Sequence, residues 1–474
     1  MKISISYPPL ESLKGVPLLS QNRQFQWFSD PTYIYPMIPA SAATLLKVNG
    51  YEIFWDDAIT EGLSYDKWKE RFIREKPDVM VIETKTPVVK RHWKIINDIK
   101  NKSLKIKNWK LKIILMGDHV TALPEESLEN SKADFVLVGG DYDFLLLKLL
   151  KNIEDPNLPK IIRNSEQYSL DELPLIDREL TKWNLYAYKN GNYKYIPGSY
   201  VMNGRDCWWG KCVFCSWTTL FPGEKFRVRS VEKALNEIGE LIKFGVKEVM
   251  EDSGTLLVGK WLDDFCQGMV KRGYNEKIKI NCNMRLNAIK DPKIWKLMKK
   301  AGFRMILFGF ESANQKTLDK INKGLKVEEI EPALRDCKSA GLEPHITIMV
   351  GYPWETKKDV ENTLAFTKKL FRKGYVDSLQ ATLAIPYPGT PLYKYCRENN
   401  LLLTEDYDRF DQREPIMKTE MSAKELKEFI QKFYRAFITP RFFWNKLKSI
   451  RNFTDLKFIL RAGKKFLNHL KDFS

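Results

Sequence analysis

Strand-like runs of β-branched and aromatic residues alternate with helical patterns along most of this chain, and that alternation limits the fold more than any other feature. In the first third the expected strands are residues 3–7, 51–55, 79–83, 112–116 and 134–138. Strands that are separated by helices pair in parallel and need helices on both faces of their sheet. Residues 1–153 are therefore predicted to form a doubly wound α/β domain.

The alternation stops over residues 154–197, where Pro156, Pro159 and Pro174 break any period, and this stretch is predicted to link two domains. It resumes with expected strands at 198–203, 246–250, 277–282, 304–308, 345–350 and 377–385. Six β/α units form a partial, open barrel, which is assigned to residues 198–410. Residues 411–474 are predicted to be helical and basic, with an apolar helix face that begins near Ser422.

Three cysteines, Cys207, Cys212 and Cys215, follow the first expected barrel strand with the spacing C-x4-C-x2-C. Three thiolates on one loop can hold three irons of a 4Fe-4S cube and leave the fourth iron open to a small molecule. A zinc knuckle and inert thiols are the alternatives. Zinc normally takes a fourth protein ligand, and the neighbouring sequence offers none at the usual spacing. The sequence favours the cluster.

The other cysteines are scattered through apolar contexts and do not form a disulfide framework: Cys266, Cys282, Cys337 and Cys396. Cysteines that form no disulfide framework indicate that the protein works in a reducing compartment. The first residues lack the apolar core of a signal peptide, and no run approaches the roughly 18 apolar residues of a membrane span. We therefore expect a cytoplasmic protein that is at most peripheral to a membrane.

The formal net charge of +18 arises from lysines that occur along the whole chain and are interrupted by acids and apolar residues. This pattern indicates a solvated basic surface, and no nucleic-acid partner is expected. Residues 440–474 are both basic and aromatic. Such a helix can lie on an anionic bilayer, or it can pack as a cap over the barrel opening.

Charged residues follow several expected barrel strands where those strands end. After the cysteines come Glu251, Asp252 and Ser253, then Arg285, then Glu311. In β/α barrels these strand ends meet at one mouth. Carboxylates suit an amine and hydroxyl groups, and an arginine suits a carboxylate. The mouth therefore suits a zwitterionic, ribose-bearing cofactor, although each residue taken singly is equally consistent with a solvated loop charge.

These strings resemble the cobalamin-binding-domain class (class B) of radical S-adenosylmethionine (SAM) enzymes over nearly the whole chain. The cysteine loop is similar to the cluster motif, although four residues instead of three separate its first two cysteines. Segments 173–177, 308–313, 350–356 and 386–393 resemble the linker, Gly-x-Glu-Ser, Gly-Pro-Glu and exit motifs of the class. The resemblance implies that the following residues bind SAM: Phe214, Glu251, Asp252, Ser253, Arg285, Glu311 and Met349.

The same resemblance implies that the first domain binds cobalamin. The residues that it places near this cofactor are Tyr7, Gly117, Asp118, His119, Gly139 and Gly140. The chain has no Asp-x-His-x-x-Gly string, so the cobalt would lack a histidine as its lower ligand. Two alternatives stay open: the domain has lost cobalamin, or His119 is a hydrogen-bonded structural residue.

The activity implied by the resemblance begins when the 4Fe-4S cluster passes one electron to SAM, which releases a 5′-deoxyadenosyl radical. That radical abstracts hydrogen from an unactivated carbon of an organic substrate. Methylation through cobalamin is favoured over ring closure or rearrangement, and a flavodoxin or ferredoxin is the expected electron donor. The sequence predicts no catalytic residue beyond the cluster cysteines. A rival from another class is a metal-stabilised RNA-binding module, suggested by the basic and aromatic-rich sequence. The basic aromatic cluster of Lys189, Tyr193, Lys194 and Tyr195 is more typical of an ordinary surface than of a platform for bases.

Overall fold

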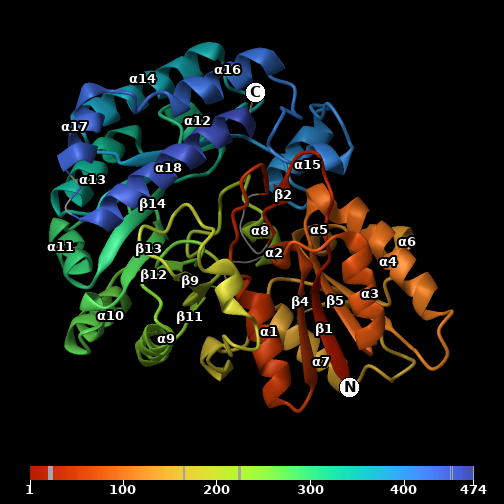
Figure 1. Ribbon diagram of the computed structural model, residues 1–474. Coiled ribbons are helices and arrows are strands. Elements are labelled where there is room, and N and C mark those ends of the chain that lie inside the picture. Colours follow the sequence, from red (N-terminus) through yellow and green to blue (C-terminus); the bar gives the residue numbers. More distant parts are fainter. Residues whose placement is uncertain (20–24, 164–165, 222–225, 449, 451, 473–474) are drawn as a thin grey trace.

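The structure is a computed structural model that describes residues 1–19, 25–163, 166–221, 226–448, 450 and 452–472. Parts of the predicted linker (164–165) and of the predicted C-terminal region (449, 451 and 473–474) thus lie outside the described residues, as do the side chains of 443, 445 and 464–472. Within the described part, two six-stranded parallel sheets dominate the molecule. Figure 1 shows the first sheet among the red and orange elements and the second among the green ones.

The first sheet has the strand order β4-β1-β5-β6-β7-β8, with parallel pairing throughout. Its strands are β1 (Lys2–Tyr7), β4 (Glu52–Asp57), β5 (Val79–Thr84), β6 (Lys112–Gly117), β7 (Phe135–Val138) and β8 (Ile161–Arg163). The predicted doubly wound parallel sheet is confirmed. The sixth strand, β8, comes from the predicted linker, and a three-residue, largely unburied edge strand carries too short a pattern to be recognised.

Helices cover both faces of the first sheet because alternate residues of its strands face opposite ways. In β5, Val79 and Val81 pack with α1 (Met37–Val48) and α7 (Tyr142–Lys151). Met80 and Ile82 pack on the other face with α3 (Tyr65–Glu75) and α4 (Val89–Ser103). All six residues of β5 are buried, as the central position of this strand requires.

The second sheet keeps its strands in the order β16-β15-β14-β13-β12-β9, again all parallel. They are β9 (Gly198–Val201), β12 (Glu248–Glu251), β13 (Lys279–Met284), β14 (Phe303–Glu311), β15 (Glu343–Val350) and β16 (Ser378–Leu383). The helices between them are α9 (Val231–Lys243), α10 (Lys260–Lys271), α11 (Pro292–Lys300), α12 (Gln315–Lys320), α13 (Val327–Ser339) and α14 (Lys357–Lys373). β9 and β16 are the two edges, so the predicted partial barrel is confirmed.

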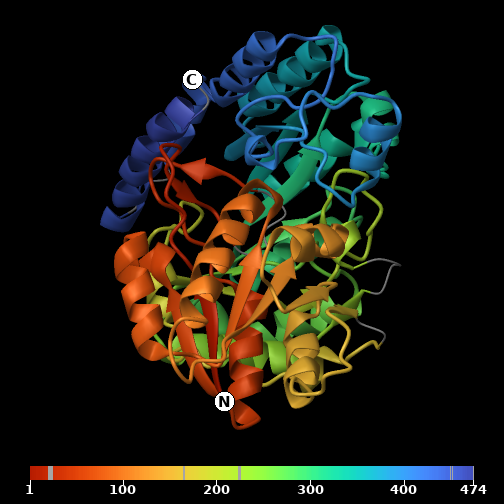
Figure 2. The same cartoon turned by 90° about the vertical axis from the view of Figure 1, so that its right-hand side faces the viewer.

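The C-terminal region contains α15 (Pro391–Glu398), α16 (Ala423–Tyr434), α17 (Pro440–Lys448) and α18 (Phe453–Asp472). Ser422 begins α16 with a capping box to Glu425, which confirms the predicted start. Tyr434 at the end of α16 donates to the carbonyl of Ala381 on β16. Figure 2 shows α18 along one side of the molecule, next to the hairpin of β2 (Val16–Pro17) and β3 (Trp27–Phe28).

Short elements complete the described fold: α2 (Ala58–Glu61), α5 (Asp118–Ala122), α6 (Pro124–Asn130), α8 (Trp217–Leu220), β10 (Gly204–Arg205) and β11 (Arg227–Val228). Helix α8 follows the cysteine loop and packs against α5 of the first domain. In the linker, the buried Arg178 donates to Glu237 of α9 at 2.6 Å and lies over the ring of Tyr35. Within the described residues, no helix combines the length and apolar character that crossing a bilayer needs.

Candidate active site at the mouth of the partial barrel

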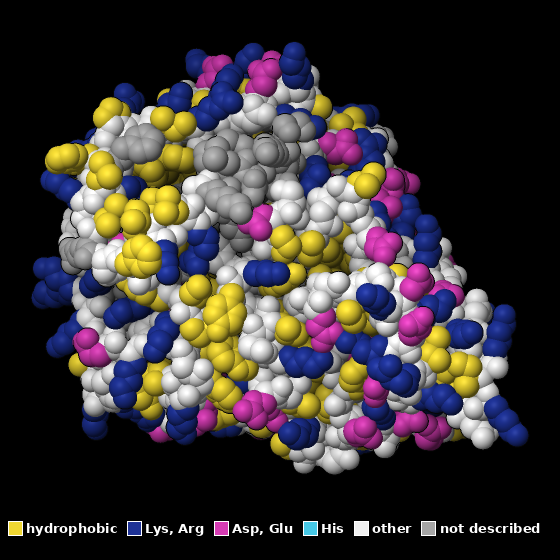
Figure 3. Space-filling view, viewed as in Figure 1, with side chains coloured by type: hydrophobic (Ala, Val, Ile, Leu, Met, Phe, Trp, Pro, Cys, Tyr) yellow, Lys and Arg dark blue, Asp and Glu magenta, His cyan; other side chains and the backbone are white. Residues whose placement is uncertain are grey.

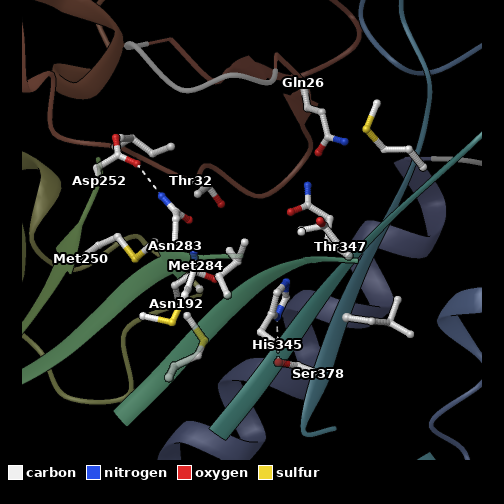
Figure 4. Close-up of a pocket in the computed structure, with 18 of the residues that line it drawn as sticks. Gln26, Thr32, Asn192, Met250, Asp252, Asn283, Met284, His345, Thr347 and Ser378 are labelled. Carbon is white, nitrogen blue, oxygen red and sulfur yellow. Dashed lines mark hydrogen bonds between the residues drawn. The ribbon is translucent and has the colours of Figure 1, made fainter. Parts of the chain in front are cut away.

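A cavity of about 840 Å³ opens at the cysteine loop and continues through the interior of the partial barrel. Its mouth is formed by the carboxyl ends of the second sheet, and its other end reaches the helices α17 and α18. Residues of the first domain between 18 and 34 also line it. Figure 4 shows side chains from β12, β13, β15 and the N-terminal segment pointing into this space. The cavity therefore joins three regions that are far apart in the sequence.

All three cysteines of the predicted cluster loop line the cavity and are partly exposed. The loop turns sharply, because Asp206 and Gly210 adopt positive φ angles of 72° and 59°. Gly254 lies beneath it, and a Cβ added there would come 2.7 Å from the Cβ of Cys207. No three His, Cys, Asp or Glu side chains of the described residues converge closely enough for a single metal ion. The donor set of three thiols on one open loop is that of a 4Fe-4S cube.

Two buried cations lie beside the cysteines. Lys323 and Arg285 both favour the thiolate of Cys212, while burial is the largest influence and raises the pKa of that thiol. Burial lowers the pKa of Lys323, but Glu311 and Cys212 outweigh it and raise the pKa above its usual value. Sequence analysis missed Lys323, since it follows α12 in a loop without any periodic pattern.

Glu311 lies at the end of β14 with a positive φ of 61° and accepts a hydrogen bond from Lys323 at 2.8 Å. Its second carboxylate oxygen accepts from Thr347 at 3.3 Å. A Cβ at Gly309 would meet the Lys323 ammonium at 2.5 Å, so glycine there makes room for this pair. The Gly-x-Glu-Ser string thus fixes one carboxylate at the rim of the cavity.

Arg285 also lines the cavity, but much of its guanidinium is already engaged. One terminal nitrogen donates to the carbonyls of Lys323 and Gly324, at 2.5 and 3.1 Å. The guanidinium carbon lies 4.1 Å from the ring centre of Trp209 and 5.6 Å from that of Trp208. The longer first gap of the cysteine motif supplies both tryptophans, and they pack the cysteine loop onto the barrel.

The three predicted residues at the end of β12 separate, because neighbouring residues of an extended chain face opposite ways. Asp252 lines the cavity, and Asn283 donates to it at 3.4 Å. Glu251 and Ser253 are buried beside it and are not among the cavity-lining residues. Ser253 donates to Glu251 and accepts from the amide of Gly204 at 2.7 Å. Burial raises the pKa of Glu251 to about 7.

Phe214 and Met349, the apolar residues predicted to contact SAM, both line the cavity. Met349 is the next-to-last residue of β15, and Gly351 and Tyr352 follow the strand in a turn. The amides of this turn donate to Glu355 at 3.0 and 3.2 Å. Of the predicted SAM residues, the structure thus brings Phe214, Asp252, Arg285, Glu311 and Met349 around one cavity.

The residues predicted to bind cobalamin lie at the carboxyl edge of the first sheet and do not line the cavity. His119 is fully buried, with Nε2 3.2 Å from Glu126 and Nδ1 3.3 Å from Thr86. Its ring lies against those of Trp93 and Tyr407. The structure therefore places His119 as a hydrogen-bonded residue of the protein interior.

The other predicted cobalamin residues are also packed against protein. The hydroxyl of Tyr7 donates to Glu83 at 2.7 Å. The amide of Gly140 donates to the carbonyl of Leu220, the last residue of α8, and a Cβ at this glycine would meet the ring of Phe221 at 2.2 Å. Phe221 thus lies directly against Gly140, whereas a Cβ at Gly139 would meet the carbonyl oxygen of Leu220 only at 3.9 Å, an ordinary van der Waals distance. The individual cobalamin contacts stay predictions.

Comparisons with known proteins agree with this geometry. Residues 204–367 match the model of the radical SAM superfamily. An uncharacterized methyltransferase of Pyrococcus horikoshii is 28% identical over 400 residues, which are 80% of this chain and 83% of that protein. An anaerobic magnesium-protoporphyrin IX monomethyl ester cyclase of Cereibacter sphaeroides is 26% identical over 417 residues, 83% of this chain. The chain spans only 65% of that cyclase.

Among solved structures, the cobalamin-dependent SAM radical enzyme OxsB, with aqua-cobalamin and SAM bound, superposes with a TM-score of 0.70. The match covers 99% of this chain and 71% of OxsB, at 14% sequence identity. The fold and the site therefore define a radical SAM enzyme. Residues 204–367 match a radical SAM domain, and the chain as a whole shares the fold of OxsB, with two six-stranded parallel sheets.

Proposed function

We propose that this enzyme methylates an unactivated carbon of an organic substrate, with a 4Fe-4S cluster, SAM and cobalamin as cofactors. The observation that carries the proposal is the convergence of three cysteines, Asp252 and Glu311 on one cavity at the barrel mouth. When bound, the cluster and SAM supply a carbon-centred radical, and cobalamin supplies a methyl carrier.

The residues of the mouth have separate tasks in this proposal. Cys207, Cys212 and Cys215 hold the cluster, and the cations Lys323 and Arg285 offset its negative charge. Asp252 would bind the amino group of SAM, and Glu311, which Lys323 and Thr347 keep oriented, would bind its ribose. Phe214 and Met349 line the cavity and would pack against the adenine.

Methylation is favoured over ring closure because of the curated relatives. The Pyrococcus protein, named a methyltransferase, is matched over 83% of its length, whereas the Cereibacter cyclase extends well beyond this chain. Cobalamin is supported by its presence in OxsB, which shares the whole two-sheet architecture. In this chain Leu220 and Phe221 contact Gly140, so a corrin bound directly against this glycine would require that segment to move.

The first test uses anaerobically reconstituted protein with SAM and dithionite. We expect 5′-deoxyadenosine to form, and we expect the Mössbauer signature of a 4Fe-4S cluster. Cys212→Ala should abolish both, while Cys266→Ala, which alters a fully buried thiol of α10, should keep both. Wild-type protein without a cluster would refute the proposal. Failure to retain added hydroxocobalamin on gel filtration would favour the cyclisation alternative.

We also propose that α17 and α18 lie on an anionic membrane surface. Large apolar side chains on these helices are exposed, among them Trp444 at 58%, Leu447 at 63% and Phe453 at 68%. Figure 3 shows hydrophobic side chains gathered over α17 and the start of α18. Residues 440–463 contain one acid, Asp455, which pairs with Lys194 at 2.8 Å. Lysines and arginines surround it in the sequence, and this charge suits anionic lipid.

Co-sedimentation with vesicles of phosphatidylcholine and phosphatidylserine tests the membrane contact. Wild-type protein should pellet with these vesicles at low salt and be released at high salt. The double substitution Leu447→Glu and Phe453→Glu should abolish pelleting. Leu104→Glu, which changes an equally exposed leucine at the end of α4, should not. Equal pelleting of all three proteins would contradict the proposal.

The setting of the reaction follows from the same features. We propose that the enzyme acts in the cytoplasm, where all seven cysteines stay reduced. A flavodoxin or ferredoxin as electron donor, and the absence of a nucleic-acid partner, stay predictions.

A further inference from the structure

The inner end of the cavity is mainly apolar. Below the mouth, the space continues between β14, β15 and β16 on one side and the C-terminal helices on the other. Met305, Leu307 and Leu379 line it from the sheet, and Phe442 and Phe458 line it from α17 and α18. The cysteines and the predicted SAM residues lie at the opposite end, so SAM bound at the mouth would leave this inner end free for another molecule.

Several charged side chains and one histidine also line this end. His345 lies on β15, where alternate residues face the cavity, and only 8% of it is exposed. Its Nδ1 lies 2.8 Å from the hydroxyl of Ser378 on the neighbouring strand. Its Nε2 is buried and has no hydrogen-bond partner among the described residues. Figure 4 shows the ring held by Ser378 on one side and facing the cavity on the other.

A buried polar nitrogen without a partner is unfavourable by roughly 1–3 kcal/mol. Such a group normally has a partner that completes the site. Burial lowers the pKa of His345 to about 4, so the ring is neutral at physiological pH. A neutral imidazole nitrogen donates or accepts one hydrogen bond, according to the tautomer. It matches an uncharged oxygen group better than a carboxylate or phosphate.

Charged residues also line this end of the cavity, but they do not form a binding site for an anion. Arg304 pairs with Glu248 at 2.6 Å and with Glu343 at 2.5 Å. Lys446 lies 3.7 Å from Asp377. Arg461 of α18 donates to the carbonyl of Tyr193. The ionic groups around the inner end are thus engaged with other parts of the protein.

We infer that the inner end of the cavity binds an apolar molecule that carries one uncharged hydroxyl or carbonyl group, hydrogen-bonded to Nε2 of His345. This inference rests on the proposed function, in which that molecule is the substrate, and it names the substrate's chemical class. His345 acts here as a binding residue that fixes the apolar chain relative to the barrel mouth.

The test measures displacement of the neutral fluorescent probe N-phenyl-1-naphthylamine from the reconstituted protein. Three competitors of equal chain length are used: 1-decanol, decanoate and decane. We expect decanol to bind about tenfold more tightly than decane, the ratio that one hydrogen bond to a buried group gives. His345→Leu should abolish the preference for decanol over decane, and His345→Gln should keep part of this preference.

His92→Leu is the matched control. His92 is also fully buried with an unpartnered Nε2, but it lies on α4 in the first domain. The His92→Leu variant should therefore show the same decanol-to-decane affinity ratio as the wild type. The chain has four histidines, so ¹⁵N spectra can show directly whether the His345 imidazole shifts when decanol binds.

Two outcomes would overturn the inference: an equal decanol-to-decane ratio in wild type and His345→Leu, or tighter binding of decanoate than of decanol. Neither measurement needs reductant or SAM cleavage. Loss of 5′-deoxyadenosine formation with an intact decanol preference would therefore refute the proposed function and leave the subsite standing.

Discussion

The two sheets have the same number of parallel strands, yet their carboxyl edges differ in what fills them. At the first sheet, Tyr7 bonds Glu83, His119 is paired with Glu126, and Phe221 covers Gly140. At the second sheet, the strand ends surround a cavity of about 840 Å³ that contains the cysteine loop. Both edges therefore bring polar side chains together at the strand ends. A site for a cofactor or substrate also requires that some of these side chains are not already bonded to other parts of the protein.

The largest effect is expected from Lys323→Met, which breaks the buried pair at the open edge. The variant leaves the Glu311 carboxylate buried without its cation, since Lys323 is its salt-bridge partner at 2.8 Å. Loss of one partner of such a pair lowers the free energy of unfolding by about 3–5 kcal/mol. Urea titration should show this loss, and Glu311→Gln combined with Lys323→Met should recover part of it. A change below about 1 kcal/mol would show that the pair is solvated.

Gly140→Ala tests whether the first edge is as filled as it appears in the structure. The added methyl would overlap the ring of Phe221, so the domain must shift or that ring must leave. We expect a loss of about 1–3 kcal/mol in the free energy of unfolding, recovered when Phe221→Ala is added. Gly463→Ala meets no atom within 4 Å and should be neutral or slightly stabilising. A neutral Gly140→Ala would indicate that this edge is open and accessible to a corrin.

Glu83→Gln tests the electrostatics of the filled edge. Burial raises the pKa of Glu83 from 4.5 to about 7, although Lys85 partly opposes this. The folded state therefore holds the proton more tightly than the unfolded state, so stability is highest below pH 4.5 and falls as the pH rises toward 7. In urea titrations, the difference in the free energy of unfolding between pH 5 and pH 8 should be smaller in the variant than in the wild type by about 2 kcal/mol. Parallel profiles for both proteins would contradict the burial of the charge.

The smallest effect concerns a contact that brings the N-terminal segment to the cavity. Gln26 donates to Gln412 at 2.8 Å, across 386 residues of sequence. Gln412→Ala leaves a buried amide without its acceptor, and we expect a loss of about 1 kcal/mol in the free energy of unfolding. Asn399→Ala, which removes an exposed amide that bonds only locally, should cost less. Equal losses would show that the Gln26 contact is not retained in solution.

Much of the fold was predictable because its signals are local. The β-branched run of β5 and the helix start at Ser422 depend on neighbours within a few positions, and both the strand and the helix start were confirmed. The strand β8 was missed because three partly exposed residues carry no period. Asp252 and Glu311 were found by the rule that places chemistry at strand ends. Lys323 and His345 were missed because neither follows the end of a strand.

The sequence by itself determined the two parallel sheets and the three cysteines of the cluster loop, since periodicity and spacing act over short distances. Only the tertiary structure decided which strand edge stays open. The segment from Trp217 to Phe221 packs into the core of the first domain, and α18 lines the barrel cavity together with α17. These choices depend on side chains that meet across hundreds of residues, and no local pattern records such contacts.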